Sequence, residues 1–127
     1  KDFLLEVISE FKSHGIRTSI FVDPVEKMVE GAKITGTDRI ELYTEAYAQN
    51  FKKNPKKAVA PYTEAAVLAS NLGIGINAGH DLNLENTAFF AQNVPHLLEV
   101  SIGHALVSES LYLGFENVVP MYLQRLS

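Results

Sequence analysis

The sequence predicts an α/β fold in which four parallel strands alternate with helices. Four short apolar runs are each followed by a segment of helical periodicity, and glycine or proline stands at most of the boundaries. The strands start roughly 20 to 36 residues apart, which is the normal length of a βα unit. Four units are too few to close an eight-stranded barrel. They therefore predict half of such a barrel or a small open sheet.

The first half of the chain opens with a helix, because apolar residues recur at helical spacing until Gly15 ends the pattern. Asp23-Pro24-Val25-Glu26 predicts the start of a second helix, with Asp23 as its cap and Glu26 completing a capping box. The expected order is helix, strand, helix, strand, polar loop and helix over residues 2–13, 18–22, 23–36, 39–43, 46–57 and 58–72.

The second half is expected to hold a strand, a weaker helix, a strand, a short helix and a final helix, within residues 73–82, 84–92, 96–105, 105–113 and from about 117 onward. Strands that alternate with helices imply parallel pairing and right-handed crossovers. Residues 1–127 are therefore expected to form one partial domain. In a half-barrel, the opening helix would belong to the preceding βα unit.

Two of the strands end in the same dipeptide, Gly79-His80 and Gly103-His104. Functional sites of parallel α/β folds lie at the carboxyl ends of the strands, so these two ends predict one shared site. His80 could instead be an ordinary surface-loop histidine, but the equivalent His104 favours a functional role. Asp23 also falls at this edge, where its role as a helix cap is the more economical explanation.

Glu41 stands between Ile40 and Leu42 in an apolar strand. Alternation places it on the face opposite those two residues, which in a barrel is the interior. A buried carboxylate is costly unless it is paired, so we expect a functional role or a buried ion pair. Glu99 raises the same question, but it lies far from the end of its strand and is expected to be structural.

Gly103-His104 leads directly into the expected short helix. Free backbone N–H groups at a helix start bind phosphate, and barrels often place a phosphate site at a short helix after the last two strands. The sequence therefore predicts a phosphate site at this position. The lysines within residues 52–57 are expected to form only a solvated face.

The composition limits the classes of function. The chain has 127 residues and a net charge of −4, which argues against nucleic-acid binding. It has no cysteine, which excludes disulfides and fits a reducing compartment such as the cytoplasm. No apolar run approaches the roughly 20 residues that span a bilayer, and no signal peptide is visible. Because the chain starts at Lys1 and a helical pattern follows at once, we expect an upstream part to be missing.

Asn77-Ala78-Gly79-His80, followed further along by Ser101-Ile102-Gly103-His104-Ala105, resembles the pyridoxine 5′-phosphate synthase family. Residues 40–47 look like the sixth strand and following loop of that family, and residues 15–23 look like its fifth strand. The resemblance covers essentially the whole chain. It implies the C-terminal half of a (β/α)8 barrel, with strands five to eight, their helices and a short extra phosphate-site helix.

The resemblance also implies a reaction, the condensation of 1-deoxy-D-xylulose 5-phosphate with 3-amino-2-oxopropyl phosphate to give pyridoxine 5′-phosphate, phosphate and water. No metal or organic cofactor is expected. By resemblance, His80 is the proton donor, Glu41 stabilises a transition state, and Gly103 and His104 hold a substrate phosphate. The family's other catalytic groups lie in the other half of the barrel, so the isolated chain is expected to be inactive. The resemblance further implies a homo-oligomer, since the family forms octamers built from dimers.

Asp81 departs from the family pattern, in which the residue after the proton donor contacts substrate and is glycine in the familiar form. A backbone contact would survive this change. A carboxylate does not favour a phosphate, so we expect the Asp81 side chain to point away from it.

Two other functions remain open at this stage. One is a metal-dependent barrel hydrolase with His80, His104 and Asp23 as ligands, which stoichiometric metal would support. The other is a non-catalytic α/β module that binds a phosphorylated ligand. Such a module should fold stably by itself, whereas half a barrel would expose two sheet edges.

Overall fold

The computed structural model describes residues 2–127 and contains one four-stranded parallel sheet. The strands lie in the order in which they occur in the chain, β1-β2-β3-β4, with bounds Ser19–Val22, Arg39–Tyr43, Gly75–His80 and Leu97–Ile102. Each strand thus pairs with the next one along the chain. This is the order found in (β/α)8 barrels, whereas doubly wound sheets reverse direction part-way. The predicted α/β half-barrel is confirmed.

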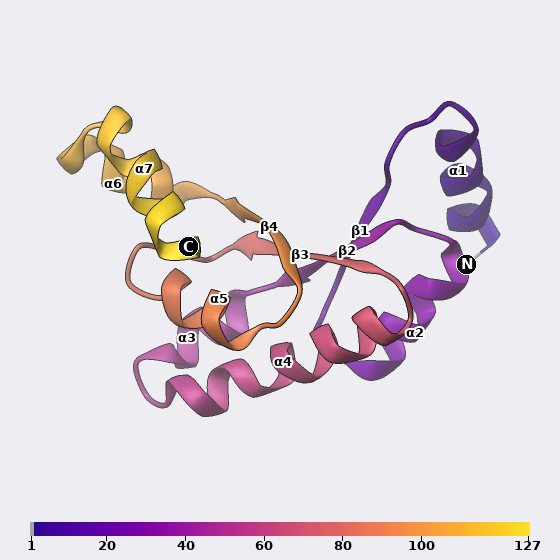
Figure 1. Cartoon of the computed structure of the whole chain (residues 1–127), viewed down its shortest axis with the longest axis horizontal. Coiled ribbons are helices and arrows are strands. Elements are labelled where there is room, and N and C mark those ends of the chain that lie inside the picture. Colours follow the sequence, from indigo (N-terminus) through magenta and orange to yellow (C-terminus); the bar gives the residue numbers. More distant parts are fainter. Residues whose placement is uncertain (1) are drawn as a thin grey trace.

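Seven helices accompany the sheet within residues 2–127: α1 Asp2–Ser13, α2 Glu26–Thr35, α3 Glu45–Phe51, α4 Pro55–Asn71, α5 Thr87–Asn93, α6 His104–Leu113 and α7 Phe115–Leu126. Helices α2 to α5 lie along one face of the sheet, and α1 and the pair α6–α7 stand at its two ends (Figure 1). Within residues 2–127 no helix combines the length and the apolar character that a membrane span requires.

Two local predictions were wrong. Part of the expected polar loop at 46–57 is helical, because Tyr47 and Phe51 are four residues apart and turn their rings to the same side of α3. Asp23 is not a helix cap. Helix α2 begins after Val25, which has extended backbone and makes no side-chain cap, and the Asp23 carbonyl accepts the N–H of Val25 at 2.7 Å.

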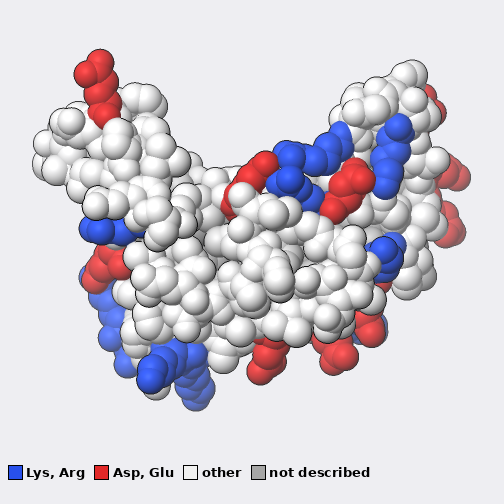
Figure 2. Space-filling model, in the orientation of Figure 1, with Lys and Arg blue, Asp and Glu red and all other residues white. Residues whose placement is uncertain are grey.

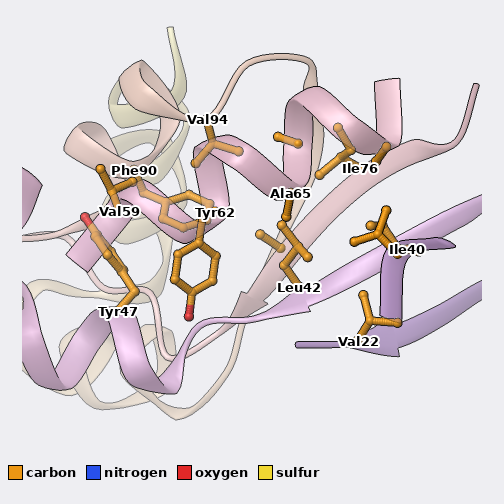
Figure 3. Close-up of a cluster of buried hydrophobic side chains, with 14 of the residues drawn as sticks. Val22, Ile40, Leu42, Tyr47, Val59, Tyr62, Ala65, Ile76, Phe90 and Val94 are labelled. Carbon is orange, nitrogen blue, oxygen red and sulfur yellow. The ribbon is translucent and has the colours of Figure 1, made fainter. Parts of the chain in front are cut away.

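The apolar core lies between the sheet and the helices on its covered face. Alternate strand residues supply one wall, and helices supply an aromatic cluster in which Tyr47, Tyr62 and Phe90 meet edge to face (Figure 3). Burial raises the pKa of the Tyr47 hydroxyl above its ordinary value, and that hydroxyl donates to the Asn86 carbonyl at 2.7 Å. The core on the covered side is thus built mainly by the strands and by α2 to α5.

The opposite face of the sheet is polar. The register places Glu41, Asn77 and Glu99 side by side across three strands. Glu99 forms ion pairs with Arg39 at 2.8 Å and Arg17 at 3.2 Å, and it accepts the side-chain amide of Asn77 at 3.1 Å. These contacts agree with the structural role expected for Glu99. Figure 2 shows acidic and basic side chains side by side in the hollow between the two raised ends of the molecule.

Candidate active site at the carboxyl ends of the strands

His80 is the last residue of β3, and its imidazole lies over an aromatic shelf formed by Phe21 and Tyr43 from the two preceding strands. The rings of Phe21 and Tyr43 are stacked with centroids 5.0 Å apart, and the His80 ring lies 5.1 Å from that of Phe21. The imidazole is 52% exposed, so its position leaves it free to contact a ligand. Neither Phe21 nor Tyr43 was predicted to belong to the site, because ring contacts between strands leave no local signal in the sequence.

Glu41 lies below His80 on the same face of the sheet. The predicted alternation is correct, since Ile40 and Leu42 are buried in the apolar core. Glu41 is only 8% exposed, and its Oε1 is 3.7 Å from Nε2 of His80. This distance suits an ion pair but exceeds that of a hydrogen bond. Within residues 2–127, Oε1 is the only buried side-chain oxygen or nitrogen without a hydrogen-bond partner. A buried oxygen without a hydrogen-bond partner lowers the stability of a folded protein, so Oε1 of Glu41 is available to bind a ligand or His80.

The backbone of His80 is strained. Its φ is +95°, in a region that residues other than glycine rarely adopt, and such a conformation costs about 1 to 3 kcal/mol. The flanking peptide groups are both held by Thr44, a buried residue that follows β2 directly. Its Oγ1 donates to the Gly79 carbonyl at 2.8 Å and accepts the Asp81 N–H at 3.1 Å.

The two glycines of the Gly-His dipeptides lie where two backbones approach closely. A Cβ on Gly79 would lie 2.1 Å from the Ser101 carbonyl oxygen, and a Cβ on Gly103 would lie 3.0 Å from the His80 carbonyl oxygen. Gly79 is therefore required for β4 to come this near to the end of β3, whereas a Cβ at Gly103 would need its neighbour to shift by a few tenths of an ångström. The strand register agrees with this close approach, because His80 pairs with Ile102, the residue just before Gly103.

Helix α6 begins at His104, as the sequence analysis expected to within one residue. Gly103 is its N-cap residue and provides no side-chain cap. No side chain caps the first backbone N–H groups of α6, and that of Leu106 bonds to the Gly103 carbonyl at 3.2 Å, so the start of the helix at the end of β4 can favour an anion. The far part of α6 is anchored, since Glu109 accepts the Leu84 N–H at 3.2 Å and the Tyr122 hydroxyl at 2.5 Å.

Asp81 lines an open hollow of about 440 Å³ together with His80, Tyr43, Asp23 and Glu45. Neither Gly103 nor His104 borders this hollow. Its carboxylates make it an unfavourable place for a phosphate. In the part of the chain that the structure describes, no three histidine or carboxylate side chains gather as metal ligands would. The ligand set considered for a metal-dependent hydrolase, which pairs His80 and Asp23 with His104, is thus not assembled here.

The whole sequence, residues 1–127, matches the model of the family described as pyridoxal phosphate biosynthesis protein PdxJ. The chain belongs to the PdxJ family. Among curated relatives, the pyridoxine 5′-phosphate synthases of Flavobacterium johnsoniae and Christiangramia forsetii are 65% and 63% identical to it over 126 residues. That of Cytophaga hutchinsonii is 56% identical over 126 residues. Each match covers 99% of this chain and 53% of the relative, so the chain spans about half the length of these PdxJ proteins.

Membership of the PdxJ family confirms the resemblance recognised from the two Gly-His motifs. It places the chain among proteins of vitamin B6 biosynthesis. The fold agrees, because four βα units over about half the length of the relatives make half of an eight-stranded barrel.

Proposed function

We propose that this chain supplies half of the active site of a pyridoxine 5′-phosphate synthase. The reaction would condense 1-deoxy-D-xylulose 5-phosphate with 3-amino-2-oxopropyl phosphate and release phosphate and water. The observation that carries the proposal is the arrangement at the ends of β3 and β4. There an exposed histidine and an uncapped helix start lie at adjoining strand ends, and the buried carboxylate of Glu41 in β2 lies 3.7 Å from the histidine.

His80 is proposed as the proton donor. Ring closure to a pyridine requires imine formation and loss of water, and both steps need a proton delivered near neutral pH, which suits histidine. Glu41 lies 3.7 Å from the imidazole and is shielded from solvent. A carboxylate in this position stabilises positive charge on His80 or on a nearby iminium-type transition state.

Gly103 and His104 are proposed to hold a substrate phosphate. The backbone N–H groups at the start of α6 can donate to phosphate oxygens, and the glycine lets the anion approach the backbone. Asp81 is proposed to contact substrate only through its backbone carbonyl, since Thr44 binds its N–H and its side chain borders the acidic hollow. Neither a metal ion nor an organic cofactor is needed for these roles.

The partner of this half-barrel is proposed to be the other half of the barrel found in the relatives. The outer edges of β1 and β4 carry no further strand within residues 2–127. Large apolar side chains are exposed on or next to α1, α6 and α7, including Phe3, Phe11, Ile16, Leu111, Tyr112 and Phe115. Closing the barrel would pair both strand edges and cover part of this apolar surface. Apolar surface left over would serve contacts between copies in a homo-oligomer.

The proposal is tested by steady-state kinetics on both phosphorylated substrates, with the release of inorganic phosphate as the readout. The variants are made in a protein that contains both halves of the barrel. We expect His80→Asn to lower kcat by about 10²- to 10⁴-fold, the range typical for loss of a general acid. Glu41→Gln should lower kcat with little change in KM, because it removes charge without removing volume.

The matched control is His14→Asn. His14 is an exposed histidine at the end of α1, paired with Glu10 and remote from the strand ends. Its replacement should leave kcat unchanged. If His80→Asn retained as much activity as His14→Asn, His80 would not be the proton donor. The isolated 127-residue chain should show no turnover, and measurable turnover would contradict the division of the site between two halves.

A further inference from the structure

Thr44 occupies a position in which its hydroxyl would ordinarily cap a helix. It is the N-cap residue of α3, and its carbonyl accepts the N–H of Ala48 at 2.9 Å in the usual way. Its side chain makes no cap, although threonine is a preferred residue there because its oxygen can accept a free N–H of the first turn. The hydroxyl is instead turned across to β3. The Thr44 hydroxyl thus forgoes a cap on its own helix and instead bonds to Gly79 and Asp81, which are distant in sequence.

The groups that Thr44 reaches are the two peptide groups on either side of His80. Its Oγ1 donates to the carbonyl of Gly79 and accepts the N–H of Asp81. A hydroxyl has one hydrogen to donate and can accept as well, so a single threonine satisfies both groups. The side chain is fully buried, so water cannot replace it in either contact.

These contacts hold His80 at its φ of +95°. The peptide group before a residue and the peptide group after it together set φ and ψ, and these angles determine where the side chain points. Without the bridge, the backbone of His80 is free to relax toward negative φ, which L-residues prefer. That relaxation would carry the imidazole away from the ring of Phe21 and from Oε1 of Glu41.

We propose that Thr44 is a positioning residue that fixes the imidazole of His80 through the backbone. The proposal rests on the proposed function, in which His80 donates a proton. A displacement of about 1 Å at a reacting group is enough to reduce a rate by about 100-fold. Because Thr44 is fully buried and acts through the backbone of His80, its loss should alter kcat and leave substrate binding nearly intact.

The test compares Thr44→Val, Thr44→Ser and Thr35→Val in a protein that contains both barrel halves. Valine keeps the shape and removes the hydroxyl, whereas serine keeps the hydroxyl. Thr35 is the matched control, because it is also buried, donates to the Ala32 carbonyl at 2.7 Å and accepts the Thr37 N–H at 3.4 Å. It lies at the end of α2 and has no contact with His80. Two readouts are used: hydrogen exchange of the Asp81 amide, and kcat with KM for both substrates.

Thr44→Val should accelerate exchange at Asp81 by about tenfold or more, because its acceptor is lost. It should lower kcat by about 10- to 100-fold while KM changes by less than about threefold. Thr44→Ser should restore both values to within about threefold of wild type. Thr35→Val should change neither, although it removes a comparable pair of buried hydrogen bonds.

The two readouts separate this proposal from the proposed function. If the Asp81 amide exchanged faster in Thr44→Val but not in Thr35→Val, and the protein had no turnover, the hydrogen-bond bridge would be supported and the reaction assigned to the chain would be overturned. Exchange at Asp81 no faster in Thr44→Val than in Thr35→Val would overturn the bridge, whatever the activity. A kcat for Thr44→Val equal to that of Thr35→Val would likewise show that the bridge does not position His80.

Discussion

Replacement of Gly79 by alanine should destabilise the protein, and by more than the same replacement of Gly103. The new Cβ would lie 2.1 Å from the Ser101 carbonyl oxygen and 2.8 Å from the Ser101 Cβ. An ordinary contact between a carbon and a carbonyl oxygen is about 3.3 Å, so β3 and β4 would have to separate by about 1 Å. Both partners are anchored in the sheet and cannot rotate away. We expect the free energy of unfolding to fall by about 3 kcal/mol or more, at the upper end of the range for overpacking.

The measurement is urea unfolding of Gly79→Ala in a protein that contains both barrel halves. The control is Gly31→Ala, because Gly31 lies within α2 and a Cβ there would meet nothing within 4 Å. This control should stabilise the protein by up to about 1 kcal/mol through helix propensity. If Gly79→Ala cost less than about 1 kcal/mol, the two strands would separate easily, and the steric argument for glycine in the motif would be refuted.

Two further predictions concern stability away from the site. The pKa of Asp38 is lowered to about 2, mainly because its carboxylate accepts the backbone N–H of Thr18 and also because it pairs with Lys12 at 3.0 Å. The unfolded chain therefore takes up this proton first as the pH falls, so the stabilisation is complete above about pH 4 and is lost between about pH 4 and pH 2. Asp38→Asn should accordingly lower the free energy of unfolding by about 1 kcal/mol at pH 6, a figure that is reduced because the carboxylate is partly exposed to solvent. At pH 3 the loss should be clearly smaller. An equal loss at pH 6 and pH 3 would contradict the lowered pKa of Asp38. Tyr47→Phe removes the hydroxyl that bonds to the Asn86 carbonyl and should cost about 1 to 2 kcal/mol in thermal unfolding, and a neutral result would show that water replaces the hydroxyl.

Much of this fold could be predicted because its signals are local. Apolar runs and bounding glycines placed all four strands, and the alternation around Glu41 correctly assigned its side chain to the polar face. Helix α3 was missed because polar and lysine residues surround its two aromatic anchors, Tyr47 and Phe51, which hides the helical pattern. The cap assigned to Asp23 followed from a good local motif, but the chain continues extended through Val25 before the helix begins.

The least predictable parts of the site depend on contacts between strands. Thr44 acts on residues 35 and 37 positions away in the chain, and nothing in its own neighbourhood indicates this. The strained backbone of His80 is similarly invisible, since a histidine after a glycine occurs in many conformations. The two Gly-His motifs were informative because their glycines record a close approach of two backbones. A sequence carries such information only where the constraint restricts the residue type.

The two faces of the sheet set an order of events in folding. The apolar face packs against helices of the same chain, and each strand pairs with the next one along the sequence, so this layer can form before the other half is present. The other face carries the ion pairs of Glu99 and the imidazole of His80, both of which stay partly exposed to water until a second half arrives. Collapse of the outer layer thus precedes closure of the lumen. Of the residues proposed for chemistry, Glu41 is already buried in this half, and the exposed imidazole of His80 leaves bulk water only on closure.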